Sequence, residues 1–282
     1  MPLRKPPAGA EAPASPDGVA GGLAWRTWTS PADGGAVPLV LAHGFTQNAE
    51  AWGPLPRLLA ASRPVMAVDL PGHGRCSSLS ADLPQAARLL GVTGGFGDYL
   101  GYSMGGRVAL HLALDQPTVV RRLVLIGATA GIDDAEERRR RRLADEALAD
   151  ELDPPDPGSA SQQQQRLEQF LQRWLAGPLF ASLAPEAACL EARRANRCSG
   201  LAASLRTCGT GTQQPLWDRL GQLDMPVLVV AGADDSRFAA IGRRLAQTIG
   251  PNARLALVSA AGHACHLQRP EAVAELVDGF LR

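Results

Sequence analysis

The sequence predicts an α/β fold with a mostly parallel central sheet, flanked by helices and carrying an inserted helical cap. Short, continuously apolar runs alternate with helix-forming segments along much of the chain, and such runs are typical of parallel strands buried on both faces. The alternation breaks over residues 128–222, which are rich in Arg, Glu and Gln. A helical insertion between two core strands is typical of a cap over the strand ends.

The elements expected for the core follow one another in a regular order. Strands are expected at residues 21–30, 37–42, 64–68, 96–100, 121–126, 225–231 and 253–258. Helices are expected at residues 82–90, 108–114, 239–249 and 271–281, the last of them amphipathic. This alternation of strand and helix predicts an open, mostly parallel sheet.

We divide the chain into a disordered tail (1–20), a first part of the core (21–127), the cap (128–222) and a second part of the core (223–282). The tail is rich in Pro, Ala and Gly and lacks the apolar segment of a signal peptide. Inside the cap, residues 153–165 read DPPDPGSASQQQQ, which we interpret as a flexible surface loop.

Composition narrows the class of protein. The 28 basic and 28 acidic residues give a formal net charge of zero, so neither nucleic acid nor an anionic membrane is an expected partner. No apolar run approaches the length of a membrane span. The five cysteines are widely spaced, with no C-x-x-C pair, which favours reduced thiols over a metal or redox site. We expect a cytoplasmic protein that is a monomer or a weak homo-oligomer.

Residues 101–105 read G-Y-S-M-G and predict a nucleophile elbow at Ser103. A segment that could end a strand precedes this pattern, and an apolar run suited to a buried helix follows it, which is the context an elbow requires. Small residues on both sides of the serine fit a strained turn with the neighbouring chain close by. The alternative is a chance Gly-rich turn, because patterns of five residues recur by accident.

Two later strand ends supply the partners that a serine nucleophile needs. A hydroxyl becomes reactive when a histidine takes its proton and an acid orients that histidine. Asp235 and His263 each follow an apolar run, in the chain order serine, acid, histidine. Asp235 is preferred to Asp234 because it is the fourth residue of G-x-x-D, and His263 is preferred to His266 because it directly follows the Ala-Gly turn. The backbone N–H groups of Phe45 and Met104 are the expected oxyanion donors, with simple pocket lining as the alternative for Phe45.

Together these motifs resemble the α/β-hydrolase superfamily over residues ~22–282. A narrower resemblance is carried by LAHGFTQNAEAW, VDLPGHGRCS, GYSMGGRVAL, GIDDAEERRRRRLADEALA, GPLFASL, ARRANRCSGLAASLRTCGTGTQQPLWDRL, GADDSRF and AGHACHLQRP. These segments are similar to the 2-succinyl-6-hydroxy-2,4-cyclohexadiene-1-carboxylate synthase family of menaquinone biosynthesis. The resemblance implies an elimination that removes pyruvate from 2-succinyl-5-enolpyruvyl-6-hydroxy-3-cyclohexene-1-carboxylate, with no metal or organic cofactor.

A substrate with several carboxylates requires guanidinium groups, which pair with carboxylates through two hydrogen bonds. Arg107 lies one helical turn after the serine in an otherwise apolar segment, so it either binds substrate or forms a structural salt bridge. By motif position, Arg141, Arg138 and Arg194 match cap arginines of the family, although most arginine runs are solvated. Tyr102 and Trp174 either line the pocket or pack in the core. The candidate substrate-binding residues are therefore Arg107, Arg141, Arg138, Arg194, Tyr102 and Trp174.

The mechanism that these residues suggest is proton removal from the carbon next to the succinyl ketone, by a serine made basic by His263 and Asp235. A conventional esterase, thioesterase or carbon–carbon bond hydrolase with the same triad is the main alternative. A non-catalytic ligand receptor is a third reading, and a dehalogenase is disfavoured because the elbow carries serine in place of aspartate.

Overall fold

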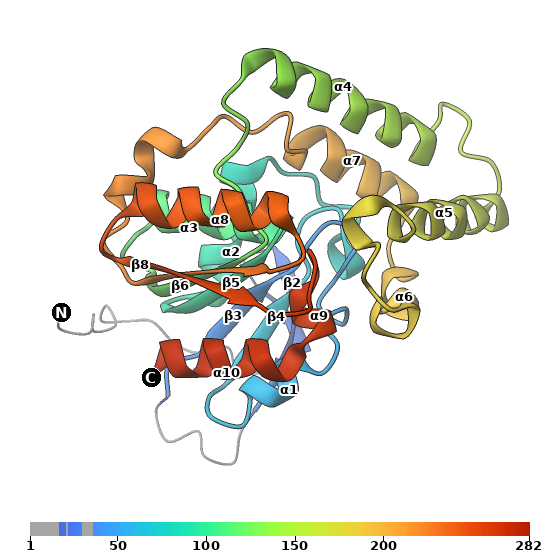
Figure 1. Ribbon diagram of the computed structural model, residues 1–282. Helices are drawn as coiled ribbons and strands as arrows, with labels where there is room; N and C mark the ends of the chain where they lie inside the picture. Colours follow the sequence, from blue (N-terminus) through green and yellow to red (C-terminus); the bar gives the residue numbers. More distant parts are fainter. Residues whose placement is uncertain (1–16, 21, 30–35) are drawn as a thin grey trace.

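A computed structural model describes residues 17–20, 22–29 and 36–282 (Figure 1). It contains an eight-stranded sheet in the order β1-β2-β4-β3-β5-β6-β7-β8. The first two strands join it in antiparallel fashion, and the other pairings are parallel. The predicted α/β fold is therefore confirmed. The strands are β1 (Asp17–Ala20), β2 (Leu23–Trp28), β3 (Leu39–Ala42), β4 (Val65–Val68), β5 (Gly97–Tyr102), β6 (Val120–Ile126), β7 (Val227–Gly232) and β8 (Ala253–Val258).

Helices cover both faces of the sheet, and each face has its own apolar core. One face carries α2 (Leu83–Gly94), α3 (Met104–Asp115) and α8 (Ser236–Ile249); the other carries α1 (Leu55–Leu59), α9 (Cys265–Gln268) and α10 (Pro270–Leu281) (Figure 1). Strands β3, β4, β6 and β7 are almost fully buried. Burial between two helical layers explains why these strands read as unbroken apolar runs in the sequence.

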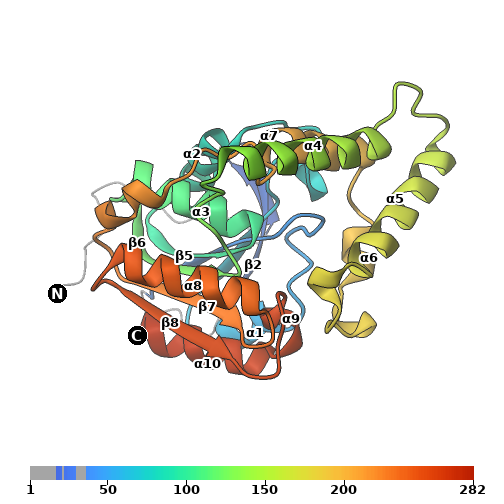
Figure 2. The same cartoon turned by 45° about the horizontal axis from the view of Figure 1, so that its top comes forward.

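Between Ile126 and Val227, a stretch that the structure describes throughout, every regular element is a helix. The longer helices are α4 (Ala135–Leu152), α5 (Ala160–Leu175) and α7 (Cys198–Cys208), and they enclose a small apolar core of their own. Figure 2 shows α4 and α7 side by side, with α5 and α6 (Leu190–Arg193) extending from the core. Short 3₁₀ turns are η1 (Gly74–Cys76), η2 (Pro178–Phe180), η3 (Pro185–Ala187) and η4 (Trp217–Gln222).

Two segments differ in kind from the sequence-based expectation. Residues 17–20 were expected in a disordered tail, but they form β1, because their backbone pairs with β2 in a tight hairpin; residues 1–16 lie outside the described part. The expected loop at 153–165 is wrong in its second half, since α5 begins at Ala160. Ser159 accepts a hydrogen bond from the Gln162 N–H, and the Gln162 side chain accepts one from the Ser159 N–H, which is a capping box.

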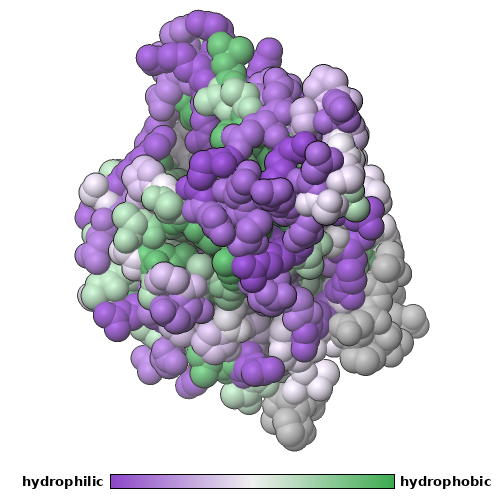
Figure 3. All heavy atoms as spheres, turned by 90° about the vertical axis from the view of Figure 1, so that its right-hand side faces the viewer, coloured by the Kyte–Doolittle hydropathy of each residue, from purple (hydrophilic) through white to green (hydrophobic). Residues whose placement is uncertain are grey.

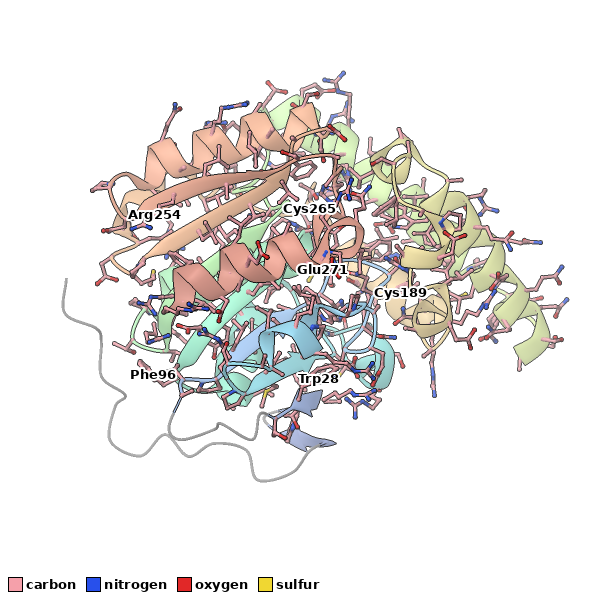
Figure 4. The ribbon with its side chains drawn as sticks, turned by 60° about the horizontal axis from the view of Figure 1, so that its bottom comes forward. Trp28, Phe96, Cys189, Arg254, Cys265 and Glu271 are labelled. Carbon is pink, nitrogen blue, oxygen red and sulfur yellow. The ribbon has the colours of Figure 1, made fainter. Side chains whose placement is uncertain are left out.

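The cap helices lie at the carboxyl ends of the parallel strands. In Figure 4, Phe96, just before β5, and Arg254, at the start of β8, lie at the end of the sheet far from the cap. Cys265 lies at the opposite end of the sheet, toward the cap residue Cys189. Ligands of open α/β sheets bind outside the carboxyl ends of the strands. Among the described residues, no helix is both long and apolar enough to cross a membrane.

The cap packs closely against the core at a pair of glycines. A Cβ on Gly200 of α7 would lie 2.5 Å from the carbonyl oxygens of Gly72 and Ser77. A Cβ on Gly72 would lie 2.4 Å from the Gly200 carbonyl oxygen, and φ there is +82°. Backbone meets backbone at this point, so neither side can move aside as a flexible side chain would.

We predict that Gly200→Ala lowers the stability of the protein by about 1–3 kcal/mol, because the added methyl overpacks this contact. The measurement is the midpoint of urea-induced unfolding. Gly221→Ala is the matched control, since a Cβ at Gly221 would meet nothing within 4 Å. Equal midpoints for the two variants would contradict the role given to the glycine contact.

Candidate active site

Ser103 occupies the turn between β5 and α3 with φ of +50°, a conformation that non-glycine residues rarely adopt. The turn is held by close packing of backbone on backbone. A Cβ on Gly105 would lie 1.9 Å from the Ala42 carbonyl oxygen, and a Cβ on Gly101 would lie 2.4 Å from the Gly105 carbonyl oxygen. The strain and the flanking glycines are those of a nucleophile elbow.

His263 lies between Ser103 and Asp235 in a hydrogen-bonded line. Its Nε2 is 3.3 Å from the Ser103 hydroxyl, and its Nδ1 is 3.2 Å from a carboxylate oxygen of Asp235. The second carboxylate oxygen of Asp235 accepts the Phe238 N–H at 3.0 Å and caps α8. Asp234, the alternative acid, is exposed. The structure therefore brings together the three residues that the sequence singled out.

The environment of Asp235 favours its charged form. Burial acts to raise the pKa of this carboxyl, but the hydrogen bonds from His263 and from the Phe238 N–H outweigh it and lower the pKa below the ordinary value of 3.8. The acid is consequently ionised at neutral pH, and its contact with Nδ1 orients the His263 ring so that Nε2 faces the serine.

His266 and Tyr102 lie behind His263, and neither lines the cleft. His266 is fully buried, and its ring lies 4.2 Å from that of Tyr102 and 5.3 Å from that of Trp52. Burial lowers the pKa of His266 to about 3, so this ring is neutral. Tyr102 also packs against His263, with ring centroids 5.3 Å apart. Of the two readings kept for Tyr102, the structure fits core packing.

The two expected oxyanion donors border the same space. Met104 is the first residue of α3, and the first N–H groups of a helix have no partner within it. Phe45 lies in the turn after β3, and both residues line the cleft that contains Ser103. The Phe45 ring packs edge-on against Trp174 of the cap, with centroids 5.2 Å apart.

The cleft lies between the elbow and the cap and has a volume of about 1130 Å³. Apolar cap residues such as Leu148, Trp174 and Leu205 form part of its wall. Figure 3 shows the cap-side face, where hydrophobic patches lie among largely hydrophilic residues. Among the described residues, no group of three or more His, Cys, Asp and Glu side chains is placed to hold a metal ion.

Two of the four candidate arginines line this cleft. Arg107 is 6% exposed, and its described hydrogen bonds, to the Gly209 carbonyl and the Gln213 side chain, are long at 3.5 Å each. No ion pair of Arg107 occurs within the described part of the chain. Arg141 is tied to the buried carboxylate of Asp145 at 2.8 Å and is more exposed. Arg107 is thus a buried cation whose natural partner would be an incoming anion.

The other two arginines are not brought to the cleft. Arg138 donates to the carbonyl oxygens of Ile132 and Asp133, at 2.7 Å and 3.0 Å. Arg194 pairs with Glu168 at 2.7 Å and with Glu191 at 2.8 Å. Both guanidinium groups are occupied by neighbours on the cap surface, which differs from the expectation that they bind substrate.

Sequence reasoning missed the neighbouring Arg193, which is 1% exposed. Its Nε donates to the Ala188 carbonyl at 2.7 Å, and its Nη1 donates to the Thr46 hydroxyl. Two adjacent arginines give no signal for which one points inward until the helix is placed. The spacing of apolar residues along the helix would have been the only sign in the sequence of which arginine faces the interior.

Comparison with known proteins agrees with this geometry. The model of the Alpha/beta hydrolase family matches residues 39–276. A Bacillus subtilis (strain 168) protein, provisionally named 2-succinyl-6-hydroxy-2,4-cyclohexadiene-1-carboxylate synthase, is 32% identical over 86% of this chain and 89% of its own length. The synthase of that name from Serratia proteamaculans is 31% identical, over 86% of this chain and 92% of its own. The chain belongs to this synthase family.

A solved relative extends the similarity to three dimensions. The structure of MenH from S. aureus superimposes with a TM-score of 0.80 at 28% identity, covering 91% of this chain and 97% of that one. Coverage this complete includes the cap, which is the part that differs most among proteins of this fold. Membership in the synthase family therefore extends to the cap as well as to the core.

The lowered pKa of Asp235 gives a prediction about stability and pH. A carboxyl with a lowered folded-state pKa stabilises the fold above its unfolded pKa, near 3.8, and this stabilisation is lost as the pH falls through the folded value. Asp235→Asn should therefore lower the thermal unfolding midpoint at pH 7, by a margin that shrinks below pH ~4. Asp234→Asn is the control and should differ little from wild type at either pH. A margin for Asp235→Asn that grows on acidification would refute the assignment.

Proposed function

We propose that this chain eliminates pyruvate from 2-succinyl-5-enolpyruvyl-6-hydroxy-3-cyclohexene-1-carboxylate, with Ser103, His263 and Asp235 acting as the base. The observation that carries the proposal is Arg107, a buried guanidinium in the cleft, one helical turn from the serine and without an ion pair in the described part of the chain. Burial lowers the pKa of Arg107 to about 10, so it stays charged at neutral pH. Such a site favours a substrate that brings its own carboxylate.

The proposed reaction begins with transfer of a proton. His263, oriented by Asp235, accepts the hydroxyl proton of Ser103 while the serine oxygen removes the proton from C2, next to the succinyl ketone. The C2–H electron pair becomes the C2=C3 bond, the C3=C4 pair moves to C4=C5, and the C5–O bond breaks. The leaving enolpyruvate takes up the proton held by His263 and becomes pyruvate. No water is added, and no acyl-enzyme forms.

Charge that develops on the succinyl ketone oxygen needs donors already in place. The N–H groups of Phe45 and Met104 are proposed to stabilise this enolate oxygen, the second with the help of the positive end of the α3 dipole. Both residues line the cleft beside Ser103. Rigid donors in a space screened from water stabilise developing charge more than solvent would.

Arg141 is proposed as a second, more mobile carboxylate contact. Its side chain is 39% exposed and is oriented by Asp145, which is buried. The described hydrogen bond from Arg141 to Asp145 uses Nε, so the terminal nitrogens of the guanidinium can pair with a substrate carboxylate while the buried Asp145 keeps its partner. Arg107 would then hold one substrate carboxylate deep in the cleft, and Arg141 would hold another nearer the solvent.

The test is a coupled assay of pyruvate release with the enolpyruvyl-cyclohexene substrate, run beside hydrolysis of p-nitrophenyl acetate. Ser103→Ala should lower kcat for pyruvate release by at least about 1000-fold. Arg107→Met should lower kcat/KM by about 100-fold, because a substrate carboxylate loses a buried charged partner. Arg139→Met is the control, since Arg139 pairs with Glu136 on the solvent side of α4, and it should leave both constants unchanged.

The opposite pattern would support a different activity. Negligible pyruvate release together with rapid ester cleavage would refute the elimination and favour an esterase with the same triad. Equal effects of Arg107→Met on both substrates would show that the arginine supports the fold of the site and does not recognise a carboxylate.

A further inference from the structure

The turn that carries Phe45 contains a strained residue. The Gln47 N–H donates to the Gly44 carbonyl at 3.1 Å, which closes a four-residue turn with Phe45 and Thr46 at its centre. Thr46, the third residue, has φ of +67°. Type II turns require a positive φ at that place and usually have glycine there, whereas for a β-branched residue this conformation is an outlier. Surrounding contacts must therefore hold Thr46.

Every polar group of Thr46 has a partner outside the turn. Its N–H donates to Nε2 of His73 at 3.3 Å. Its carbonyl oxygen accepts the side-chain amide of Asn196 at 2.7 Å, and its hydroxyl accepts Nη1 of Arg193. Two of these three partners belong to the cap, although the turn belongs to the core. The cap therefore supplies most of the hydrogen bonding that keeps Thr46 in place.

The same cap segment is anchored to the core at further points. The Gly74 N–H donates to the side-chain oxygen of Asn196 at 2.7 Å, and the Asn48 side chain donates to the Ala192 carbonyl at 2.5 Å. Figure 4 labels Cys189, the residue directly before α6, next to the loops of the core. Residues 190–196 thus form a segment docked on the core. The Asn196 side chain alone joins two core loops, because it bonds both Thr46 and Gly74.

Arg193 is an unusual residue for a purely structural contact. It is 1% exposed and has no ion pair within the described ranges, and burial lowers its pKa to about 10. A buried charge without a carboxylate is destabilising, and a neutral side chain could fill the same space at lower cost. Its Thr46 contact gives a reason for the charge, because a charged donor forms a stronger hydrogen bond to a hydroxyl than a neutral one.

We propose that Arg193 and Asn196 are positioning residues that hold Thr46 at positive φ and so orient the Phe45 N–H for the oxyanion. Phe45 and Thr46 are the two central residues of one turn. The Gly44 carbonyl shares its peptide with the Phe45 N–H, so the Gln47 hydrogen bond that closes the turn also fixes the direction of that N–H. Relaxation of Thr46 to a negative φ would draw the Gln47 N–H away from the Gly44 carbonyl, and the peptide that carries the Phe45 N–H would lose the bond that orients it. This inference rests on the proposed use of the Phe45 N–H. The oxyanion hole is then complete only while residues 190–196 are docked.

The decisive comparison uses glycine at position 46, since glycine adopts positive φ without strain. Asn196→Ala and Arg193→Met should each lower kcat for pyruvate release by about tenfold or more, with KM within about twofold, because the misplaced donor acts on the transition state. Adding Thr46→Gly to either variant should restore most of kcat. The thermal unfolding midpoint should not recover with it, because the lost hydrogen bonds are still missing.

Arg197→Met is the matched control, an exposed arginine directly after the docked segment, and should retain wild-type kcat. Full activity in Asn196→Ala would overturn the proposal. A higher KM with unchanged kcat, not reversed by Thr46→Gly, would also overturn it, because that pattern is expected of a residue that contacts the substrate. If Arg193→Met fails to fold, the comparison of Asn196→Ala with and without Thr46→Gly decides the question.

Failure of the proposed function is recognised separately. Wild-type protein that releases no pyruvate would refute the elimination, and the same variants would then be compared by kcat for p-nitrophenyl acetate, whose tetrahedral intermediate needs the same donors. Loss and rescue in that assay would uphold the positioning role, and unchanged ester hydrolysis would overturn it.

Discussion

The active-site end of this protein depends on how closely the start of α3 passes the end of β3. A Cβ on Gly105 would lie 1.9 Å from the Ala42 carbonyl oxygen, so only glycine permits the contact. The contact forces Ser103 into its strained turn at the edge of the sheet. It also brings the first N–H of α3 beside the loop that carries Phe45. One backbone contact thus places the nucleophile and both candidate oxyanion donors together.

Arginines at the surface and in the interior differ in their partners. Surface arginines such as Arg139 and Arg194 are paired with glutamates on their own or adjoining segments. Arg107 and Arg193 are buried and lack such partners in the described structure. An unpaired charge in the interior lowers stability. Arg107 faces the cleft, and Arg193 is bound to Thr46, next to Phe45 in the cleft wall. Both charges therefore lie beside the site where anionic chemistry is proposed.

The core and the order of Ser103, Asp235 and His263 could be predicted because each residue follows an apolar strand, and strand ends of a parallel sheet meet at one edge. The contacts of the cap arginines could not be predicted from the sequence. One residue of helix rotates a side chain by about 100°, so Arg193 points inward and Arg194 outward, although the sequence presents them as equals. The start of α5 was missed because its Pro- and Gln-rich composition resembles a loop and conceals a capping box.

Exchange of the cap for another would be a direct way to change which substrates reach the cleft, because cap residues form part of its wall. The hydrogen bonds of residues 190–196 to Thr46 make such an exchange less independent than the domain boundary suggests. A transplanted cap without this segment would leave Thr46 without two of its three hydrogen-bond partners. Chimeras of this protein should therefore treat the turn and the docked segment as one inherited unit.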